Sequence, residues 1–118
     1  MASFLPSIFS GTPAGGASVV VSDAAIASGT IVHTATAVAG CVDEIWIWAQ
    51  NNGVANLELT VGFGGTAVKD SITCIIPMKS GLFLLVPGLR LNAGAVVRAR
   101  AATANVVSLF VNVNRYTV

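Results

Sequence analysis

Turn-forming residues divide this chain into short segments of similar length. They recur at the spacing of about 8–12 residues that all-β sandwiches show. The turns are expected at 28–29, 39–40, 51–53, 64–65, 79–81, 87–88, 92–94 and 104–105. Asn52-Gly53 is the strongest of them, because an Asn-Gly pair adopts positive φ angles at little cost, and it predicts a tight hairpin.

The side chains between these turns alternate with a period of two. Polar and apolar residues alternate over 56–63 and again over 107–114, which is typical of a strand with one buried face. No stretch has a helical period, so the sequence predicts an all-β fold: a single antiparallel β-sandwich, jelly-roll-like, of about eight strands. The strands are expected near 17–22, 30–37, 42–50, 54–63, 70–76, 82–86, 95–101 and 106–116.

The first sixteen residues differ from the rest in composition. Two prolines interrupt a short run of large apolar residues, and Gly15-Gly16 follows, so no helix of useful length fits. We expect an extended N-terminal arm over 1–16 and the sandwich domain over 17–118. The arm packs either on its own domain or on a neighbouring subunit. Its candidate interface residues are Phe4, Leu5, Ile8 and Phe9.

One expected strand, 42–50, is apolar on both faces. Ile45 and Ile47 project to one side, and Trp46 and Trp48 project to the other. If the isoleucines enter the core, the tryptophans lie on an outer face that needs a cover. We interpret Trp46 and Trp48 as interface residues, because tryptophan is enriched at interface hot spots. The alternative is a platform on which sugar rings stack.

Charged residues are scarce, and this shortage constrains the partners. They make up 9% of the chain and hydrophobic residues 54%, against about 25% charged residues in an ordinary domain. The surface is therefore either coated with Thr, Ser, Asn and Gly or buried against other chains. A net charge of +1 with six scattered basic residues gives no basic stripe for phosphates, so we expect no nucleic-acid partner.

A membrane partner is not expected either. The uncharged stretch 24–42 is long enough to span a bilayer, but Ser, Gly, Thr and His residues interrupt it, and its β-branched residues suit strands. The N-terminus lacks the basic region of a secretory signal and carries Pro6 within its apolar run. We therefore expect assembly in a cytoplasm.

No set of residues with the composition of a catalytic centre is evident. His33 has no carboxylate close to it in the sequence, which favours a structural histidine. Asp43 and Glu44 are neighbours on a strand and so project to opposite faces, which prevents them from sharing a substrate. Cys41 and Cys74 are expected to be free thiols, with a disulfide as the alternative. We expect no enzyme activity, no metal and no cofactor.

Two stretches resemble small β-sandwich proteins of tailed bacteriophage particles. In residues 86–94 a strand ends in a Leu-x-Leu-x-x-Gly corner, and a further strand leads to Ala-Asn-Val-Val-Ser at 104–108. Residues 45–60 have the matching central shape, an apolar strand, an Asn-rich turn and an alternating strand. The likeness covers roughly residues 17–116, and none of the matched residues is a functional signature.

The resemblance implies a capsid decoration (cement) protein, a non-catalytic structural protein of the virion. Such proteins stabilise the head shell through self-association, often as homotrimers, and through contacts with the major capsid protein or other virion proteins. The resemblance also leaves open a tail, neck or host-attachment component. A carbohydrate-binding β-sandwich module is the remaining alternative. For the first two, the expected location is the virion, assembled in the host cytoplasm.

Overall fold

The computed structural model describes residues 3–7, 18–24, 29–65, 67–79 and 81–117. Nine strands lie in these ranges, together with one 3-10 turn, Val68–Asp70. The strands are β1 (Ser3–Ser7), β2 (Val19–Val20), β3 (Thr30–Thr34), β4 (Cys41–Asn51), β5 (Leu57–Phe63), β6 (Ser71–Ile76), β7 (Phe83–Leu91), β8 (Val96–Ala101) and β9 (Val107–Thr117).

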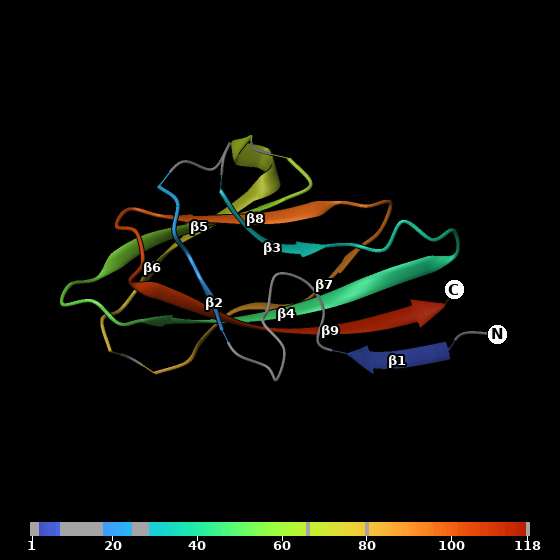
Figure 1. Cartoon of the computed structure of the whole chain (residues 1–118), viewed down its shortest axis with the longest axis horizontal. Coiled ribbons are helices and arrows are strands. Elements are labelled where there is room, and N and C mark those ends of the chain that lie inside the picture. The colour runs from blue at the N-terminus through green and yellow to red at the C-terminus, as the bar shows by residue number, and fades with distance from the viewer. Residues whose placement is uncertain (1–2, 8–17, 25–28, 66, 80, 118) are drawn as a thin grey trace.

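The strands form two packed antiparallel sheets (Figure 1). One sheet has the order β1-β9-β4-β7, with β2 also paired to β9, and the other has the order β3-β8-β5-β6. The pairs β5–β6, β4–β7, β3–β8 and β2–β9 are thus nested inside one another along the chain. This arrangement is that of a jelly roll and confirms the predicted all-β sandwich of about eight strands.

The centre of the first sheet is the pairing of β4 with β9. The two strands pair from Cys41 opposite Thr117 to Asn51 opposite Val107 without a register shift. Between Ile45 and Ala49 and between Val107 and Val113, their inward residues are Ile, Val, Leu and Ala. Most of them are β-branched, and β-branched side chains pack well on a pleated surface. They meet the inward residues of β5 and β8 in one hydrophobic core.

The N-terminal segment contributes an edge strand. β1 pairs with the end of β9, with Phe4 opposite Tyr116 and Leu5 opposite Arg115. β2 pairs with the same edge of β9 farther along, at Leu109 and Ser108. Residues 3–7 therefore pair with their own domain through the backbone, while Ile8 and Phe9 lie outside the described residues.

The expected hairpin at Asn52-Gly53 is wrong. β4 and β5 belong to different sheets, and Gly53 is not among the glycines with positive φ. The corner is instead organised by Asn51, which is fully buried. Its side-chain oxygen accepts the N–H of Gly53 at 2.9 Å, and its amide nitrogen donates to the carbonyls of Ala55 at 2.9 Å and Ile76 at 3.0 Å.

The expected turn at Pro87-Gly88 is also wrong, because both residues lie inside β7. The register with β4 shifts there, which leaves Gly88 as an extra residue in a bulge at φ 85°. Proline and glycine are tolerated in edge strands and bulges. A Cβ on Gly88 would lie 3.1 Å from Cζ2 of Trp46, so the glycine also makes room for the indole ring.

Replacing Asn51 by Ala tests the corner. The change leaves the buried carbonyl of Ile76 and two part-buried groups, the N–H of Gly53 and the carbonyl of Ala55, without this partner, so we expect the free energy of unfolding to fall by about 2–4 kcal/mol. Asn52→Ala is the matched control, because the side chain of exposed Asn52 donates to Oγ of Ser108, at 3.2 Å, and its loss should cost less than about 1 kcal/mol. Urea unfolding followed by tryptophan fluorescence measures both, and equal losses would contradict the role given to Asn51.

Candidate functional site

Trp46 and Trp48 lie on the outer face of the first sheet, as the alternation of β4 predicts. Ile45 and Ile47 are fully buried, whereas both tryptophans are partly exposed. The two indole rings stack with centroids 6.3 Å apart and an angle of 19° between their planes. Trp48 lies opposite Phe110 of β9 and Leu84 of β7, and directly paired residues share a face of the sheet.

We call this surface, formed by Leu84, Trp46, Trp48 and Phe110, the tryptophan face. Leu84 is 45% exposed. A row of apolar side chains thus crosses three strands on the side of the sheet away from the core. Contiguous exposed apolar surface of this kind marks a contact site in soluble proteins.

Glu44 fixes the orientation of Trp46 from the same face. Its carboxylate accepts hydrogen bonds from Nε1 of Trp46 at 3.0 Å, from Oη of Tyr116 at 3.2 Å and from Nδ2 of Asn114 at 3.3 Å. The bond from Trp46 is the main reason that the pKa of Glu44 lies below its usual value. The indole N–H is therefore satisfied within the chain.

A second apolar surface lies where the two sheets end side by side. Of the twelve large apolar side chains that are exposed among the described residues, seven lie between residues 72 and 89. They are Ile72, Ile75, Met78, Leu82, Phe83, Leu84 and Leu89. We call this surface, made of β6, β7 and the connection between them, the β6–β7 edge. Lys79 is its only charged residue between 71 and 89.

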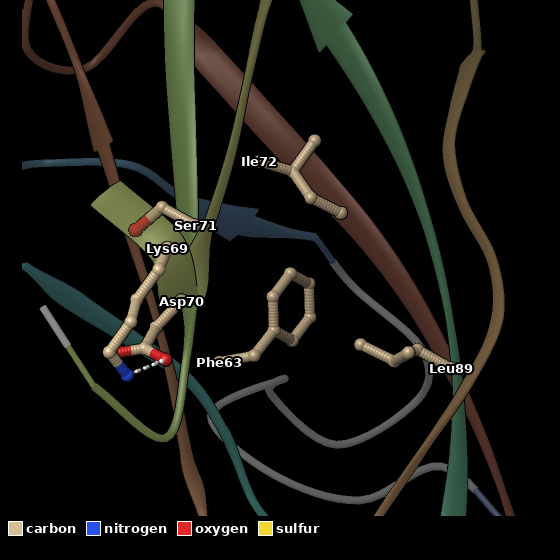
Figure 2. A pocket seen from close by; sticks show the side chains of 6 residues that line it. All are labelled: Phe63, Lys69, Asp70, Ser71, Ile72 and Leu89. Carbon is tan, nitrogen blue, oxygen red and sulfur yellow. Dashed lines mark hydrogen bonds and ion pairs between the residues drawn. The ribbon is translucent and has the colours of Figure 1, made fainter. Parts of the chain in front are cut away.

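A solvent-open cavity of about 290 Å³ lies between the two sheets at this edge. Figure 2 shows Phe63, Ile72 and Leu89 directed into the cavity, with Lys69 and Asp70 at one side. Lys69 donates to Asp70 at 2.9 Å. Because Leu89 belongs to the first sheet and the other two apolar residues belong to the second, the cavity lies between the edges of the two sheets.

A buried ionic network lies at one end of the sandwich. Asp43 is fully buried and His33 is 1% exposed, and His33 Nε2 lies 2.8 Å from Oδ2 of Asp43. Arg115 donates to both carboxylate oxygens, at 2.6 and 3.0 Å, and the N–H of Thr36 donates at 3.0 Å. Burial raises the pKa of Asp43, but the hydrogen bonds from Arg115, His33 and Thr36 outweigh it and leave the pKa below its usual value.

This network joins β3, β4 and β9 and is closed to a substrate. An imidazole beside a carboxylate is a common catalytic pair, but here both side chains are inside the protein and the carboxylate is occupied by an arginine. The contact between His33 and Asp43 could not be predicted from the local sequence, because the two residues are ten positions apart and lie on different sheets. Glu44 projects to the opposite face from Asp43, as expected.

The two cysteines are the remaining candidate residues. Cys41 and Cys74 are free thiols, as expected, and lie half-buried on strands of different sheets. Within the described residues, no group of three or more His, Cys, Asp or Glu side chains is placed to hold a metal ion. No helix in the described part of the chain is long and apolar enough to cross a membrane.

The two closely spaced arginines of β8 lie on the outer face of the second sheet and are partly exposed. Arg98 donates to the carbonyl of Gly29, and Arg100 donates to Glu58, each at 3.3 Å. The outer face of the second sheet is thus polar beside the arginines, in contrast to the tryptophan face.

Comparisons of the chain with protein-family models, with curated proteins and with solved structures give no match.

The structure thus places Trp46 and Trp48 on one outer face, as the sequence indicated, and adds the β6–β7 edge, which sequence analysis missed. The signal for this edge was present, since residues 71–89 hold a single charge. Nothing in the local pattern showed that both strands end their sheets on the same side.

The network around Asp43 predicts how stability depends on pH. Because the folded pKa of Asp43 lies below the ordinary value of 3.8 for this carboxyl group, its ionised form stabilises the fold at pH values above 3.8. That contribution is lost as the pH falls through the folded pKa. We expect the free energy of unfolding from urea titrations to decrease between pH 5 and 2.

Glu44 also has a lowered pKa, so the measurement is made in the Glu44→Gln variant. The decrease that remains there reports on Asp43. A stability of this variant that does not change between pH 5 and 2 would contradict the assignment.

Proposed function

We propose that this chain is a non-catalytic structural subunit of a larger protein assembly, of the type that capsid decoration (cement) proteins represent. The observation that carries the proposal is the β6–β7 edge. Seven of the twelve large apolar side chains that are exposed among the described residues belong to it, and Lys79 is the only charged residue between 71 and 89. Leaving such a surface in water costs roughly 25 cal/mol for each Å², so it is stabilised by burial against another chain.

The position of the tryptophan face supports two simultaneous contacts. Leu84 belongs to both surfaces, so the apolar area continues from the edge onto the outer face of the first sheet. A decoration protein must bind its own copies and also the shell. We assign self-association to the β6–β7 edge and attachment to a second protein to the tryptophan face.

Two groups of polar side chains that could take part in chemistry are engaged within the chain, which fits a structural role. The carboxylate–imidazole pair is enclosed, and Glu44 on the tryptophan face is engaged by three donors. The resemblance in residues 86–108 is the ground for proposing a specific assembly. This assembly is a bacteriophage virion, put together in the host cytoplasm, with the major capsid protein as partner. A tail, neck or host-attachment component would use the same two surfaces on a different partner.

The stacked tryptophans favour one second candidate, a carbohydrate-binding module. Two nearly parallel indole rings on a flat strand offer a platform to which a sugar ring can stack. Asn112 lies opposite Trp46 in the register of β4 with β9 and provides a polar group beside it. This candidate requires no self-association.

The mass of the purified protein in solution tests the structural proposal. We expect a stable closed oligomer by light scattering on a sizing column, because the β6–β7 edge is buried between copies. The resemblance implies a trimer. A soluble monomer that stays monomeric at high protein concentration would contradict self-association and leave only the resemblance in support of the proposal.

Tryptophan fluorescence distinguishes the carbohydrate-binding module from the structural subunit. Under the structural proposal, a panel of neutral oligosaccharides at millimolar concentration leaves the emission spectrum unchanged. A saturable change in emission that is lost in Trp48→Ala, with the oligomer mass unaltered, would favour the carbohydrate-binding module. Phe110→Ala, a change beside Trp48 that leaves both indoles in place, serves as the matched control.

A further inference from the structure

Strand β6 is an edge strand without the features that normally prevent pairing with another chain. It pairs with β5 on one side only, and no strand of the described residues pairs with its other side. Its six residues, Ser71–Ile76, contain no charge and no proline, and its register with β5 is regular. A row of unpaired N–H and C=O groups along such a strand is a template for strand addition.

The other edge strands are all protected. β7 contains Pro87, and its register with β4 shifts twice. β3 has a register shift between Ile31 and His33. On the far side of the first sheet, β1 contains Pro6 and β2 is two residues long. Bulges, prolines and short length are the devices by which native sheets block edge pairing. Among the edge strands that the structure describes, only β6 lacks them.

The side chains of β6 also favour a partner. Ile75 lies on the outer face of the second sheet, opposite Glu58, and is 55% exposed. Ile72 lies on the inner face, at the cavity of Figure 2, and is 38% exposed. Apolar side chains are thus exposed on both faces of an unpaired strand, so a strand added to β6 would cover part of each.

We propose that β6 pairs with β6 of a second copy of this chain, antiparallel about a two-fold axis, so that two four-stranded sheets become one continuous sheet. This inference rests on one part of the proposed function, the self-association of the chain. A strand paired with itself about a two-fold axis presents the same donors, acceptors and side chains on both sides, and such contacts are the commonest in homo-oligomers. The resemblance implies a trimer, whereas this contact closes with two copies.

The size of the surface agrees with a stable contact. Because β7 lies on the same side of the sandwich, pairing of β6 brings the β6–β7 edges of both copies together. Ile72 lines cavities with Leu89, Val86 and Pro87 across this side. Among the described residues from Ser71 to Leu91, all but Ile76 and Val86 are at least partly exposed, and this number approaches the roughly 20–30 residues that each partner gives to a standard interface.

The face alternation of β6 limits the symmetric registers. Residues facing the core must lie opposite residues that face the core in the second copy. The two registers that pair most of the strand are centred on Cys74 or on Thr73. In the first, Cys74 lies opposite Cys74 of the second copy, and in the second, Thr73 lies opposite its own equivalent.

Charged substitutions on β6 and β3 test the pairing. We expect wild-type protein to be a dimer by light scattering and Ile75→Lys to be a monomer, because a charge on an edge strand blocks pairing. The fold should survive, since the new ammonium group lies opposite Glu58. Ile31→Glu is the matched control: Ile31 is 46% exposed on the other edge strand of the same sheet and lies opposite Arg98. This variant should remain a dimer.

The outcomes separate the two proposals. A trimer, or a dimer that persists in Ile75→Lys with unchanged circular dichroism, overturns pairing through β6 and leaves the proposed function standing. A monomeric wild-type protein overturns pairing through β6 and leaves only the resemblance in support of the proposed function.

Cysteine cross-linking gives an independent reading of the register. The Cys41→Ser variant keeps Cys74 as its only thiol, and Cys41→Ser/Cys74→Ser/Thr73→Cys moves the thiol by one residue. We expect one of the two to form a covalent dimer on oxidation. The reaction is run at alkaline pH, because burial raises the pKa of Cys74. Cys74→Ser, which retains only Cys41, should not cross-link, and failure of both test variants contradicts the pairing.

Discussion

The pairing of β4 with β9 is the constraint on which the rest of this structure depends. Both strands have eleven residues and remain in register throughout, so one face supplies the centre of the core and the other supplies the tryptophan face. Each end of the ladder is fixed by a buried polar group. Asp43 bonds Arg115, its cross-strand partner, at one end, and Asn51 holds the corner to β5 at the other.

This arrangement explains how a chain with so few charges leaves apolar surface exposed. Several of its charged groups are engaged inside or across the sandwich: Asp43 with Arg115, Glu44 with Trp46, and Glu58 with Arg100. An ion pair that is buried and hydrogen-bonded must stay paired, because removing one partner leaves the other as a buried charge without compensation. These groups therefore do not solvate the β6–β7 edge, where Lys79 is the only charged residue between 71 and 89.

Much of the fold was predictable, because the period of two reports which face of a strand is buried. The alternation placed Trp46 and Trp48 outside and Ile45 and Ile47 inside. The pattern does not report which strands pair, so it missed that β4 crosses to another sheet at Asn52-Gly53 and that Pro87-Gly88 fits a bulge. The contact of His33 with Asp43 and the exposure of the β6–β7 edge both follow from strand order, which local sequence does not encode.

The nested order of the strands also has a kinetic consequence. β4 lies near the middle of the chain, yet its central partner β9 begins at residue 107, and β2 and β1 then pair with that same late strand. The chain must close such long loops, at a cost in conformational entropy, before strand pairing contributes any favourable free energy. Proteins dominated by such distant contacts fold in about milliseconds to seconds. On the ribosome, β4 stays without that partner until the final strand has emerged, so this domain acquires its central ladder only after synthesis of nearly all its residues.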